Sequence, residues 1–161
     1  MAETIRWGIL GCGSIAKKFA AAVEDVEGAE ILSAGSRSQA KADAFADEFA
    51  IPRRYGSYED LVSDDDVDAV YVATPHPYHM DCCILAMNDG KAVLCEKPFA
   101  LNADQARTMV AVARFNEVFL MEAMWSRFLP SLQKAKELIT SGTIGDLRMI
   151  HADLGFRADF N

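Results

Sequence analysis

The sequence predicts an α/β protein with a Rossmann-type, doubly wound parallel sheet, followed by only the start of a second α+β domain. Three observations predict this fold. Short apolar runs alternate with segments of helical periodicity, a glycine-rich turn joins the first run to the first helical segment, and no hairpin signal lies between the runs. Strands joined through helices form right-handed crossovers. We place the first domain at residues 1–121 and the beginning of the second at residues 122–161.

The first elements form a β-α-β unit. Residues 5–10 are an apolar run that ends in glycines, and residues 14–26 carry apolar side chains at helical spacing. Residues 30–34 predict the second strand, and the alanine-rich residues 39–49 predict the second helix. Residues 53–55 predict a short third strand.

The sequence signal for a strand is strongest at residues 68–73. Its sequence DAVYVA is apolar throughout its middle, as in a strand that is buried on both faces. A brief helix with an S-x-x-D cap at residues 57–60 precedes it. A helix at residues 78–88 follows, with Gly90 as its C-terminal stop.

Two more strands complete the predicted sheet. Residues 91–95 and 118–121 are short apolar runs, and the helix between them begins with Asn102 and Gln105 in a capping-box pattern. No internal repeat or low-complexity linker interrupts this alternation.

The character of the sequence changes after residue 122. AMWSRFLP is aromatic and ends in Pro130, an amphipathic helix is predicted up to residues 141–142, and residues 146–156 predict a strand. A single strand needs partners for its edges. We therefore expect a truncated chain that stops as a second sheet begins.

Composition narrows the class of protein. The 161 residues are 51% hydrophobic and 25% charged, which is typical of a globular protein, and the net charge of −8 disfavours binding to nucleic acid or to an anionic membrane. No signal peptide or membrane span is recognisable, so a cytoplasmic protein is expected. The four cysteines are expected to be reduced and buried.

The glycine turn predicts a nucleotide site. The run from Gly11 to Ala16 has the G-x-G-x-x-A form of the dinucleotide fingerprint and stands between a strand and a helix. Gly11 would allow the tight turn, and Gly13 would allow a pyrophosphate to approach the backbone closely. Ala16 would allow the helix to pack closely against the sheet. Ser14 and Ile15 open the helix whose N–H groups would face the phosphates. The alternatives are a bare tight turn or another nucleotide-like ligand such as S-adenosylmethionine.

The end of the second strand favours NADP(H) over NAD(H). An NAD-selective domain usually carries an acidic residue there, whereas this chain has Ser36, Arg37 and Ser38. An arginine fork suits a 2′-phosphate, which a carboxylate would repel. The alternative is a solvated loop arginine.

Two loops at the carboxyl edge of the sheet carry further candidates. Thr74, Pro75, His76 and His79 follow the strongest strand, where ligands of open α/β folds bind. The two histidines could form a metal pair, but no third ligand completes it, so we predict no metal site.

Glu96, Lys97 and Pro98 end the next strand at the same edge. Pro98 favours an extended Lys97, and a lysine whose pKa is lowered by partial burial can act as the proton donor and acceptor of hydride chemistry. The alternative is an exposed lysine paired with Glu96.

Four segments, GILGCGSIA, DAVYVATPHPYH, GKAVLCEKPFAL and EAMWSRFLP, together resemble the glucose-fructose oxidoreductase, inositol dehydrogenase and rhizopine catabolism superfamily. The match runs over essentially all 161 residues. The SR turn and the E-A-x-W-x-R-F pattern are most similar to its branch of dimeric trans-1,2-dihydrobenzene-1,2-diol dehydrogenases and NADP-dependent D-xylose 1-dehydrogenases.

The resemblance implies roles for these residues. Lys97 would sit beside the nicotinamide and help to transfer the proton, with Glu96 near the cofactor, and Trp125 and Arg127 would lie at the boundary between cofactor and substrate. The alternative for Trp125 is packing beneath the second domain. The family further implies a homodimer and a sugar or trans-dihydrodiol substrate.

Two functions follow as hypotheses. The first is an NADP-dependent oxidoreductase that transfers a hydride between nicotinamide and a CH–OH group, with Lys97 in the proton relay. The second is a non-catalytic NADP(H)-binding module or remnant, because the expected second domain is incomplete.

Overall fold

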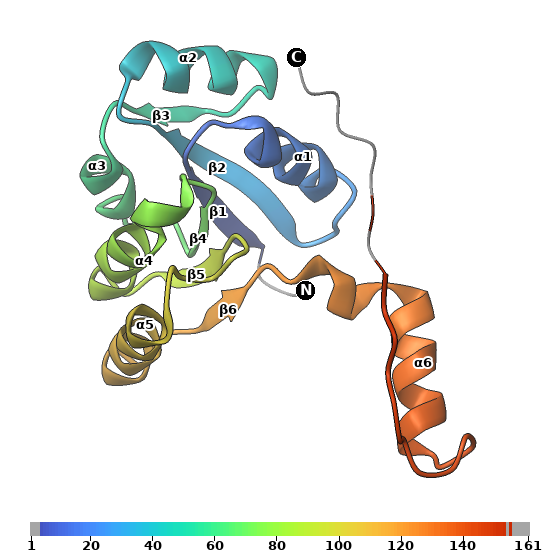
Figure 1. Cartoon of the computed structure of the whole chain (residues 1–161). Helices are drawn as coiled ribbons and strands as arrows, with labels where there is room; N and C mark the ends of the chain where they lie inside the picture. Colours follow the sequence, from blue (N-terminus) through green and yellow to red (C-terminus); the bar gives the residue numbers. More distant parts are fainter. Residues whose placement is uncertain (1–3, 154, 156–161) are drawn as a thin grey trace. The chain divides into compact units, whose positions relative to one another are not determined.

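A computed structural model describes residues 4–153 and residue 155, and the chain divides after Ala123 into two compact units. The first unit is a six-stranded parallel sheet with the order β3-β2-β1-β4-β5-β6 (Figure 1). Strands and helices alternate along the chain, which confirms the predicted Rossmann-type α/β fold. The elements of this unit are β1 (Ile5–Leu10), α1 (Ser14–Val23), β2 (Ala29–Gly35), α2 (Gln39–Glu48), β3 (Arg53–Tyr55), α3 (Tyr58–Val62), β4 (Ala69–Val72), the 3-10 helix η1 (His76–Tyr78), α4 (His79–Asn88), β5 (Ala92–Cys95), α5 (Ala103–Phe115) and β6 (Leu120–Glu122).

Helices cover both faces of this sheet. Side chains of β4 and of Ala73, which follows it, contribute to the hydrophobic core on each face. Val70 and Val72 pack with α3, α4 and α5 on one face, whereas Tyr71 and Ala73 pack with α1 and α2 on the other. All four residues are less than a tenth exposed. This alternation explains why the strand is apolar throughout: side chains on both faces of a parallel sheet are buried.

The short helix α3 packs its Leu61 side chain directly against two glycines of the sheet. A Cβ atom at Gly8 would stand 2.7 Å from Leu61 Cδ2, and one at Gly35 would stand 2.9 Å from Leu61 Cδ1. Leu61 is fully buried and fills the space above both glycines. The absence of side chains at these two positions therefore sets the distance between α3 and the sheet.

Two predicted helix caps are present. The Asp60 backbone N–H donates to Ser57 Oγ at 3.1 Å, and the Gln105 backbone N–H donates to Asn102 Oδ1 at 3.0 Å. Each bond satisfies an N–H group that has no partner inside its helix. The sequence pattern thus located the starts of α3 and α5 correctly.

A network of ion pairs and hydrogen bonds links β3 to the loop between α3 and β4. Asp64 accepts hydrogen bonds from Arg53 Nη1 at 2.6 and 2.8 Å and from the Tyr55 hydroxyl at 2.8 Å. Only 7% of the Asp64 side chain is exposed. Burial disfavours its charged form, but the bonds from Arg53 and Tyr55 outweigh burial and hold the pKa of Asp64 below its ordinary value.

Asp64→Ala is expected to lower the free energy of unfolding by about 1.5–3 kcal/mol at pH 7, because it leaves a guanidinium and a phenol without their shared acceptor. A carboxylate whose pKa is lower in the folded state stabilises the protein above the pKa of the unfolded state, and this stabilisation is lost as the pH falls through the folded pKa. Urea unfolding at pH 7 and pH 3 measures both effects. A difference between wild type and variant that is as large at pH 3 as at pH 7 would contradict the assignment.

The second unit contains η2 (Trp125–Phe128) and α6 (Pro130–Thr140). The predicted helix is therefore present, but residues 146–153 do not form the predicted strand, and residues 154 and 156 of that prediction lie outside the described residues. The strand prediction is wrong over 146–153 because a strand needs a hydrogen-bonded neighbour, and the described residues of this unit contain no strand for it to pair with. Trp125, Phe128, Met149 and Ile150 are exposed apolar side chains of this unit.

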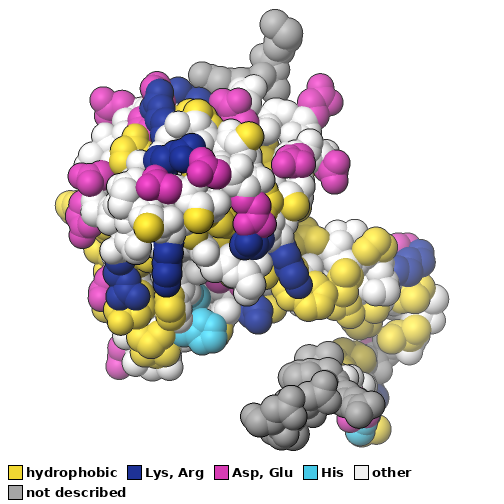
Figure 2. Space-filling model, turned by 90° about the horizontal axis from the view of Figure 1, so that it is seen from above, with side chains coloured by type: hydrophobic (Ala, Val, Ile, Leu, Met, Phe, Trp, Pro, Cys, Tyr) yellow, Lys and Arg dark blue, Asp and Glu magenta, His cyan; other side chains and the backbone are white. Residues whose placement is uncertain are grey.

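Acidic and basic side chains are interspersed on the face of the first unit seen in Figure 2. Among the residues that the structure describes, no helix combines the length and the apolar character that crossing a membrane requires. The compartment in which the protein resides stays a prediction.

Candidate functional site

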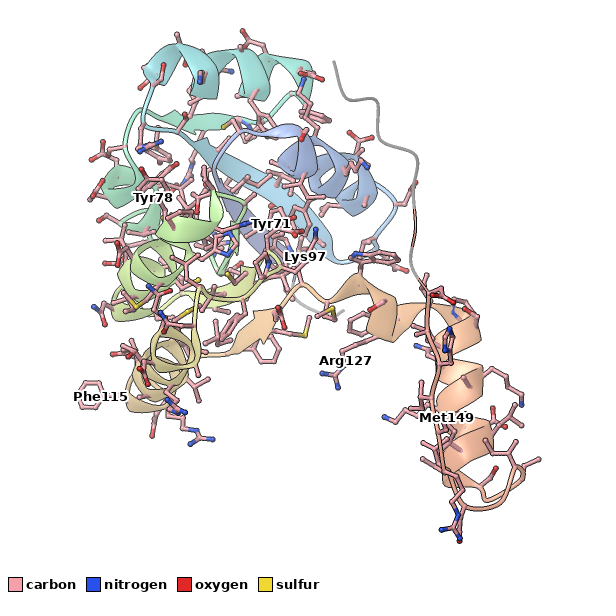
Figure 3. The ribbon with its side chains drawn as sticks, in the orientation of Figure 1. Tyr71, Tyr78, Lys97, Phe115, Arg127 and Met149 are labelled. Carbon is pink, nitrogen blue, oxygen red and sulfur yellow. The ribbon has the colours of Figure 1, made fainter. Side chains whose placement is uncertain are left out.

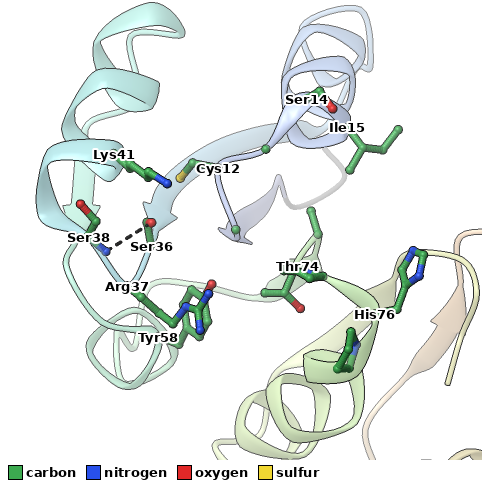
Figure 4. Close-up of a pocket in the computed structure, with 15 residues that line it drawn as sticks. Cys12, Ser14, Ile15, Ser36, Arg37, Ser38, Lys41, Tyr58, Thr74 and His76 are labelled. Atoms are coloured by element: carbon green, nitrogen blue, oxygen red, sulfur yellow. Dashed lines mark hydrogen bonds between the residues drawn. The ribbon is translucent and has the colours of Figure 1, made fainter. Parts of the chain in front are cut away.

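A crevice of about 850 Å³ lies at the carboxyl ends of β1, β2 and β4 (Figure 4). All of its lining residues belong to the first unit. This is the edge at which open α/β sheets bind their ligands. The lining residues are Gly11, Cys12, Gly13, Ser14, Ile15, Ser36, Arg37, Ser38, Lys41, Tyr58, Ala73, Thr74, Pro75, His76 and Pro77.

The turn between β1 and α1 requires glycine at Gly11. Its φ of +95° lies in the left-handed region, and a Cβ atom there would stand 2.8 Å from the carbonyl oxygen of Ala73. Gly13 differs, because a Cβ atom at that position would meet no atom within 4 Å. The backbone at Gly13 therefore borders open space in the crevice, as the close approach of a pyrophosphate would require.

The N-terminus of α1 offers unpartnered N–H groups to the crevice. Gly13 is its N-cap, no side chain caps the helix, and its first turn contains no acidic residue. Ser14 and Ile15 line the crevice, and the positive end of the helix dipole favours an anion there. Ala16 faces inward and is fully buried, which allows the helix to pack closely against the sheet.

The loop after β2 brings positive charge to the crevice. The Ser38 backbone N–H donates to Ser36 Oγ at 3.4 Å (Figure 4), and the Arg37 guanidinium carbon lies 4.7 Å from the centre of the Tyr78 ring. Lys41, in the first turn of α2, lines the same region. No carboxylate is among the lining residues of the described crevice. This end of the crevice is therefore suited to an anion.

The loop after β4 supplies a polar atom without a partner. Thr74 is 5% exposed, and its Oγ1 has no hydrogen-bond partner among the described residues. Buried hydroxyl groups are normally hydrogen-bonded, so an unpaired hydroxyl beside the crevice fits a ligand group that would complete it. Together with the open space at Gly13, this shows that the residues present fit a dinucleotide.

The structure places His79 beneath the loops rather than on the crevice surface. The side chain is fully buried, with Nδ1 2.9 Å from the Pro98 carbonyl oxygen and Nε2 2.9 Å from the Thr74 carbonyl oxygen. Burial favours the neutral ring, but contacts with Cys95 and with these two carbonyl groups outweigh it and raise the pKa of His79. His79 thus connects the loop after β4 to the loop after β5.

Glu96 and Lys97 lie at the end of β5, outside the lining of the crevice described above. The Tyr71 hydroxyl donates to Glu96 Oε1 at 2.6 Å, and the Lys97 backbone N–H donates to Glu96 Oε2 at 3.0 Å. The Glu96 carboxylate is thereby fixed between a core tyrosine and the lysine backbone. Figure 3 labels the two residues that it joins, Tyr71 and Lys97. The Lys97 side chain is exposed in this structure, which is one of the two arrangements that the sequence left open.

Trp125 and Arg127 belong to η2 of the second unit, and both are exposed there. The crevice is built without them, because its lining comes from the first unit alone.

Lys41 and Tyr58 line the crevice but were not among the predicted site residues. Lys41 follows Arg37 by four residues at the start of a helix, and this spacing could have indicated it. No sequence signal pointed to Tyr58, which α3 carries to the crevice.

Cys12 also lines the crevice and is partly exposed, whereas the other three free cysteines are buried as predicted. Burial raises the pKa of the Cys12 thiol to about 11. No group of three or more potential metal ligands occurs among the described residues.

Two known proteins are similar to this chain over 94% of its length. The trans-1,2-dihydrobenzene-1,2-diol dehydrogenase of Mus musculus is 46% identical over 154 residues, which are 94% of this chain and 46% of the mouse protein. The enzyme of the same name from Homo sapiens is 41% identical over 153 residues. The chain spans about half the length of these curated relatives.

Solved structures show the same fold with both nicotinamide cofactors. The scyllo-inositol dehydrogenase of Lactobacillus casei, solved with NAD(H) and scyllo-inositol, is 29% identical with a TM-score of 0.83, and the match covers 89% of this chain and 43% of that one. KijD10, a 3-ketoreductase from Actinomadura kijaniata solved in an open conformation with TDP-benzene and NADP, is 33% identical with a TM-score of 0.81, covering 89% and 46%.

The family described as "Oxidoreductase family, NAD-binding Rossmann fold" matches residues 5–124, which include the six strands of the described sheet and the lining of the crevice. This chain therefore belongs to the GFO/IDH/MocA family of oxidoreductases, whose Rossmann domain binds a nicotinamide dinucleotide.

Proposed function

We propose that this protein is an NADP(H)-dependent dehydrogenase that transfers a hydride between the nicotinamide and a sugar or a trans-dihydrodiol. The observation that carries the choice of NADP(H) is the pair of cations, Arg37 and Lys41, at a crevice whose lining has no carboxylate. A 2′-phosphate would find two positive partners there, and the acidic residue that selects NAD through its ribose hydroxyls is absent from the described lining. The substrate class follows the dihydrodiol dehydrogenases that the chain resembles.

The residues of the crevice would hold the cofactor in three groups. The amides around Gly13 and Ser14 would face the pyrophosphate, and Ser36, Arg37, Ser38 and Lys41 would hold the adenosine 2′-phosphate. Thr74, Pro75 and His76 would line the nicotinamide side, with His79 supporting their loop from beneath.

Lys97 would move the proton in this reaction. When bound, NADP(H) supplies or accepts the hydride, and the hydroxyl proton of the substrate needs a separate group. Lys97 can donate or accept that proton at Nζ. Glu96 would orient the lysine backbone through its bond to the Lys97 N–H, and Tyr71 fixes Glu96 in turn.

We further propose that residues 1–121 form the dinucleotide-binding domain and that residues 122–161 begin the substrate and dimerisation domain, with Trp125 and Arg127 at the boundary between cofactor and substrate. The family match over residues 5–124 supports the first of these domains. We propose the substrate and dimerisation domain, and a homodimeric assembly, from the sequence resemblance alone.

A non-catalytic NADP(H)-binding module is the second candidate. All lining residues of the crevice belong to the first unit, which supports cofactor binding by that unit alone. Titration with NADPH, followed by nicotinamide fluorescence, combined with an assay of NADP⁺ reduction by D-xylose or a trans-dihydrodiol separates the two candidates. Binding without turnover supports the module, and failure to bind any nicotinamide dinucleotide contradicts both.

Arg37→Asp is expected to weaken NADPH binding roughly 10- to 100-fold, because it replaces a charge-assisted phosphate partner with a like charge. The affinity for NADH should change less than about threefold, since NADH has no 2′-phosphate. Isothermal titration of both cofactors measures the ratio. Arg114→Asp, an equal change of charge on α5 outside the crevice lining, is the control. Equal weakening of NADH and NADPH by Arg37→Asp would contradict the assignment of the phosphate site.

A further inference from the structure

Arg37 and Tyr78 connect the two walls of the crevice. Arg37 belongs to the loop between β2 and α2, and Tyr78 ends η1 in the loop after β4. The guanidinium carbon of Arg37 lies over the Tyr78 ring, 4.7 Å from its centre. A cation within about 6 Å of an aromatic centroid is attracted by the negative face of the ring. The two residues are far apart in the sequence, so the fold itself creates this contact.

The contact leaves the charge of Arg37 available to a ligand. No carboxylate among the described residues forms an ion pair with Arg37. An aromatic ring attracts the guanidinium without neutralising it. Arg37 therefore retains its positive charge and its N–H donors while the ring restricts its position.

Tyr78 contacts Arg37 but is not itself a lining residue of the crevice. Arg37, Tyr58 and Pro77 are lining residues, whereas Tyr78 is not, although 42% of its surface is exposed. Its ring contacts the Arg37 guanidinium, and it is Arg37 that lines the crevice. Figure 4 shows Arg37 beside Tyr58, a second ring on the same side of the crevice.

We propose that Tyr78 is a positioning residue for cofactor selectivity, whose ring holds the Arg37 guanidinium where it meets the 2′-phosphate of an adenosine nucleotide. This inference rests on the proposed function. A free arginine side chain loses rotamer freedom when it binds, and a side chain that is already restricted loses less. Tyr78 therefore strengthens binding of the phosphorylated nucleotide without touching the phosphate.

The test compares Tyr78→Leu with Tyr78→Phe, using NADPH, NADH, 2′,5′-ADP and 5′-AMP as probes in isothermal titration. Tyr78→Leu removes the ring and is expected to weaken NADPH and 2′,5′-ADP roughly three- to tenfold. NADH and 5′-AMP should change less than about twofold, because neither carries the 2′-phosphate. Tyr78→Phe retains the ring and should restore the wild-type ratio. Phe115→Leu, which removes an 87% exposed ring on α5 outside the crevice lining, is the matched control.

A double-mutant cycle with Arg37→Ala tests the coupling. If Tyr78 acts through Arg37, Tyr78→Leu has no further effect on NADPH affinity once Arg37 is replaced. An equal loss for NADPH and NADH would overturn the inference and leave the proposed function intact, because it would mean that Tyr78 contacts the adenine or shapes its loop. An undiminished effect of Tyr78→Leu in the Arg37→Ala background would overturn it as well. If the wild-type protein binds neither NADPH nor NADH, the proposed function fails and this inference with it.

Discussion

Gly11→Ala is expected to lower the free energy of unfolding by about 2–4 kcal/mol, from the left-handed backbone conformation and the overpacked contact combined. The position has a φ of +95°, and the added Cβ would lie 2.8 Å from the Ala73 carbonyl oxygen. That oxygen belongs to the backbone, so no flexible side chain can move aside. The turn must shift, and the amides that face the crevice shift with it. Urea unfolding followed by circular dichroism measures the loss.

The same substitution is expected to weaken NADPH binding roughly 10- to 100-fold, because hydrogen bonds to a charged phosphate are lost when the turn moves. Gly28→Ala is the matched control. Its φ of +81° imposes a similar backbone strain, but a Cβ atom there would meet nothing within 4 Å, and it does not line the crevice. We expect Gly28→Ala to cost about 1–2 kcal/mol of stability and to leave the affinity for NADPH unchanged. Wild-type affinity in Gly11→Ala would show that the turn does not hold the cofactor.

Lys97→Met is expected to lower the rate of hydride transfer roughly 10²- to 10⁴-fold, the usual contribution of a general acid or base. The methionine side chain is similar in length to lysine but has no group that can donate or accept a proton. Lys97 lies outside the lining of the described crevice, so the affinity for NADPH should change less than about twofold. Single-turnover reduction of NADP⁺ with D-xylose or a trans-dihydrodiol measures the rate, and fluorescence titration measures the affinity.

The control for this variant is Lys18→Met, which removes an exposed lysine of α1 that does not line the crevice. It should leave both the rate and the affinity unchanged. A Lys97→Met variant that keeps its rate within about threefold would exclude Lys97 from the proton relay. A rate that falls only as far as the affinity falls would instead assign Lys97 to cofactor binding.

The sheet could be predicted from the sequence because its strands are buried on both faces. Uninterrupted apolar runs such as the one around Val70 and Val72 are typical of the central strands of a parallel sheet, and glycines or caps mark where the helices begin and end. The prediction failed at residues 146–153, which belong to the segment DLRMIHADLGF that was expected to form a strand. Local pattern cannot supply the neighbouring strand that such a segment needs.

The crevice could be predicted in part. Gly11, Gly13, Arg37 and Thr74 were identified because a motif or a strand end places them at one edge of the sheet. Tyr58 could not be identified, because it reaches the crevice through the packing of α3, which depends on contacts far apart in the sequence.

The local sequence pattern also could not predict the surroundings of two candidate site residues, His79 and Lys97. Nothing in the spacing of His79 indicated that its ring would be buried between two carbonyl groups, and the sequence left open whether the Lys97 side chain would be exposed or partly buried. Sequence motifs thus identified the candidate site residues, whereas tertiary packing determines how exposed each of their side chains is.

The close approach of α3 to the sheet also affects the nucleotide site. Leu61 rests above Gly8 and Gly35 in the interior, and the same short helix begins with Tyr58, which lines the crevice. Any side chain added at either glycine would press on Leu61, and either the Leu61 side chain or α3 with its tyrosine would have to move. The proposed adenosine end of the crevice is thus coupled to positions outside the crevice lining. A directed-evolution search for altered cofactor preference should therefore randomise Gly8, Gly35 and Leu61 together with the residues of the crevice itself.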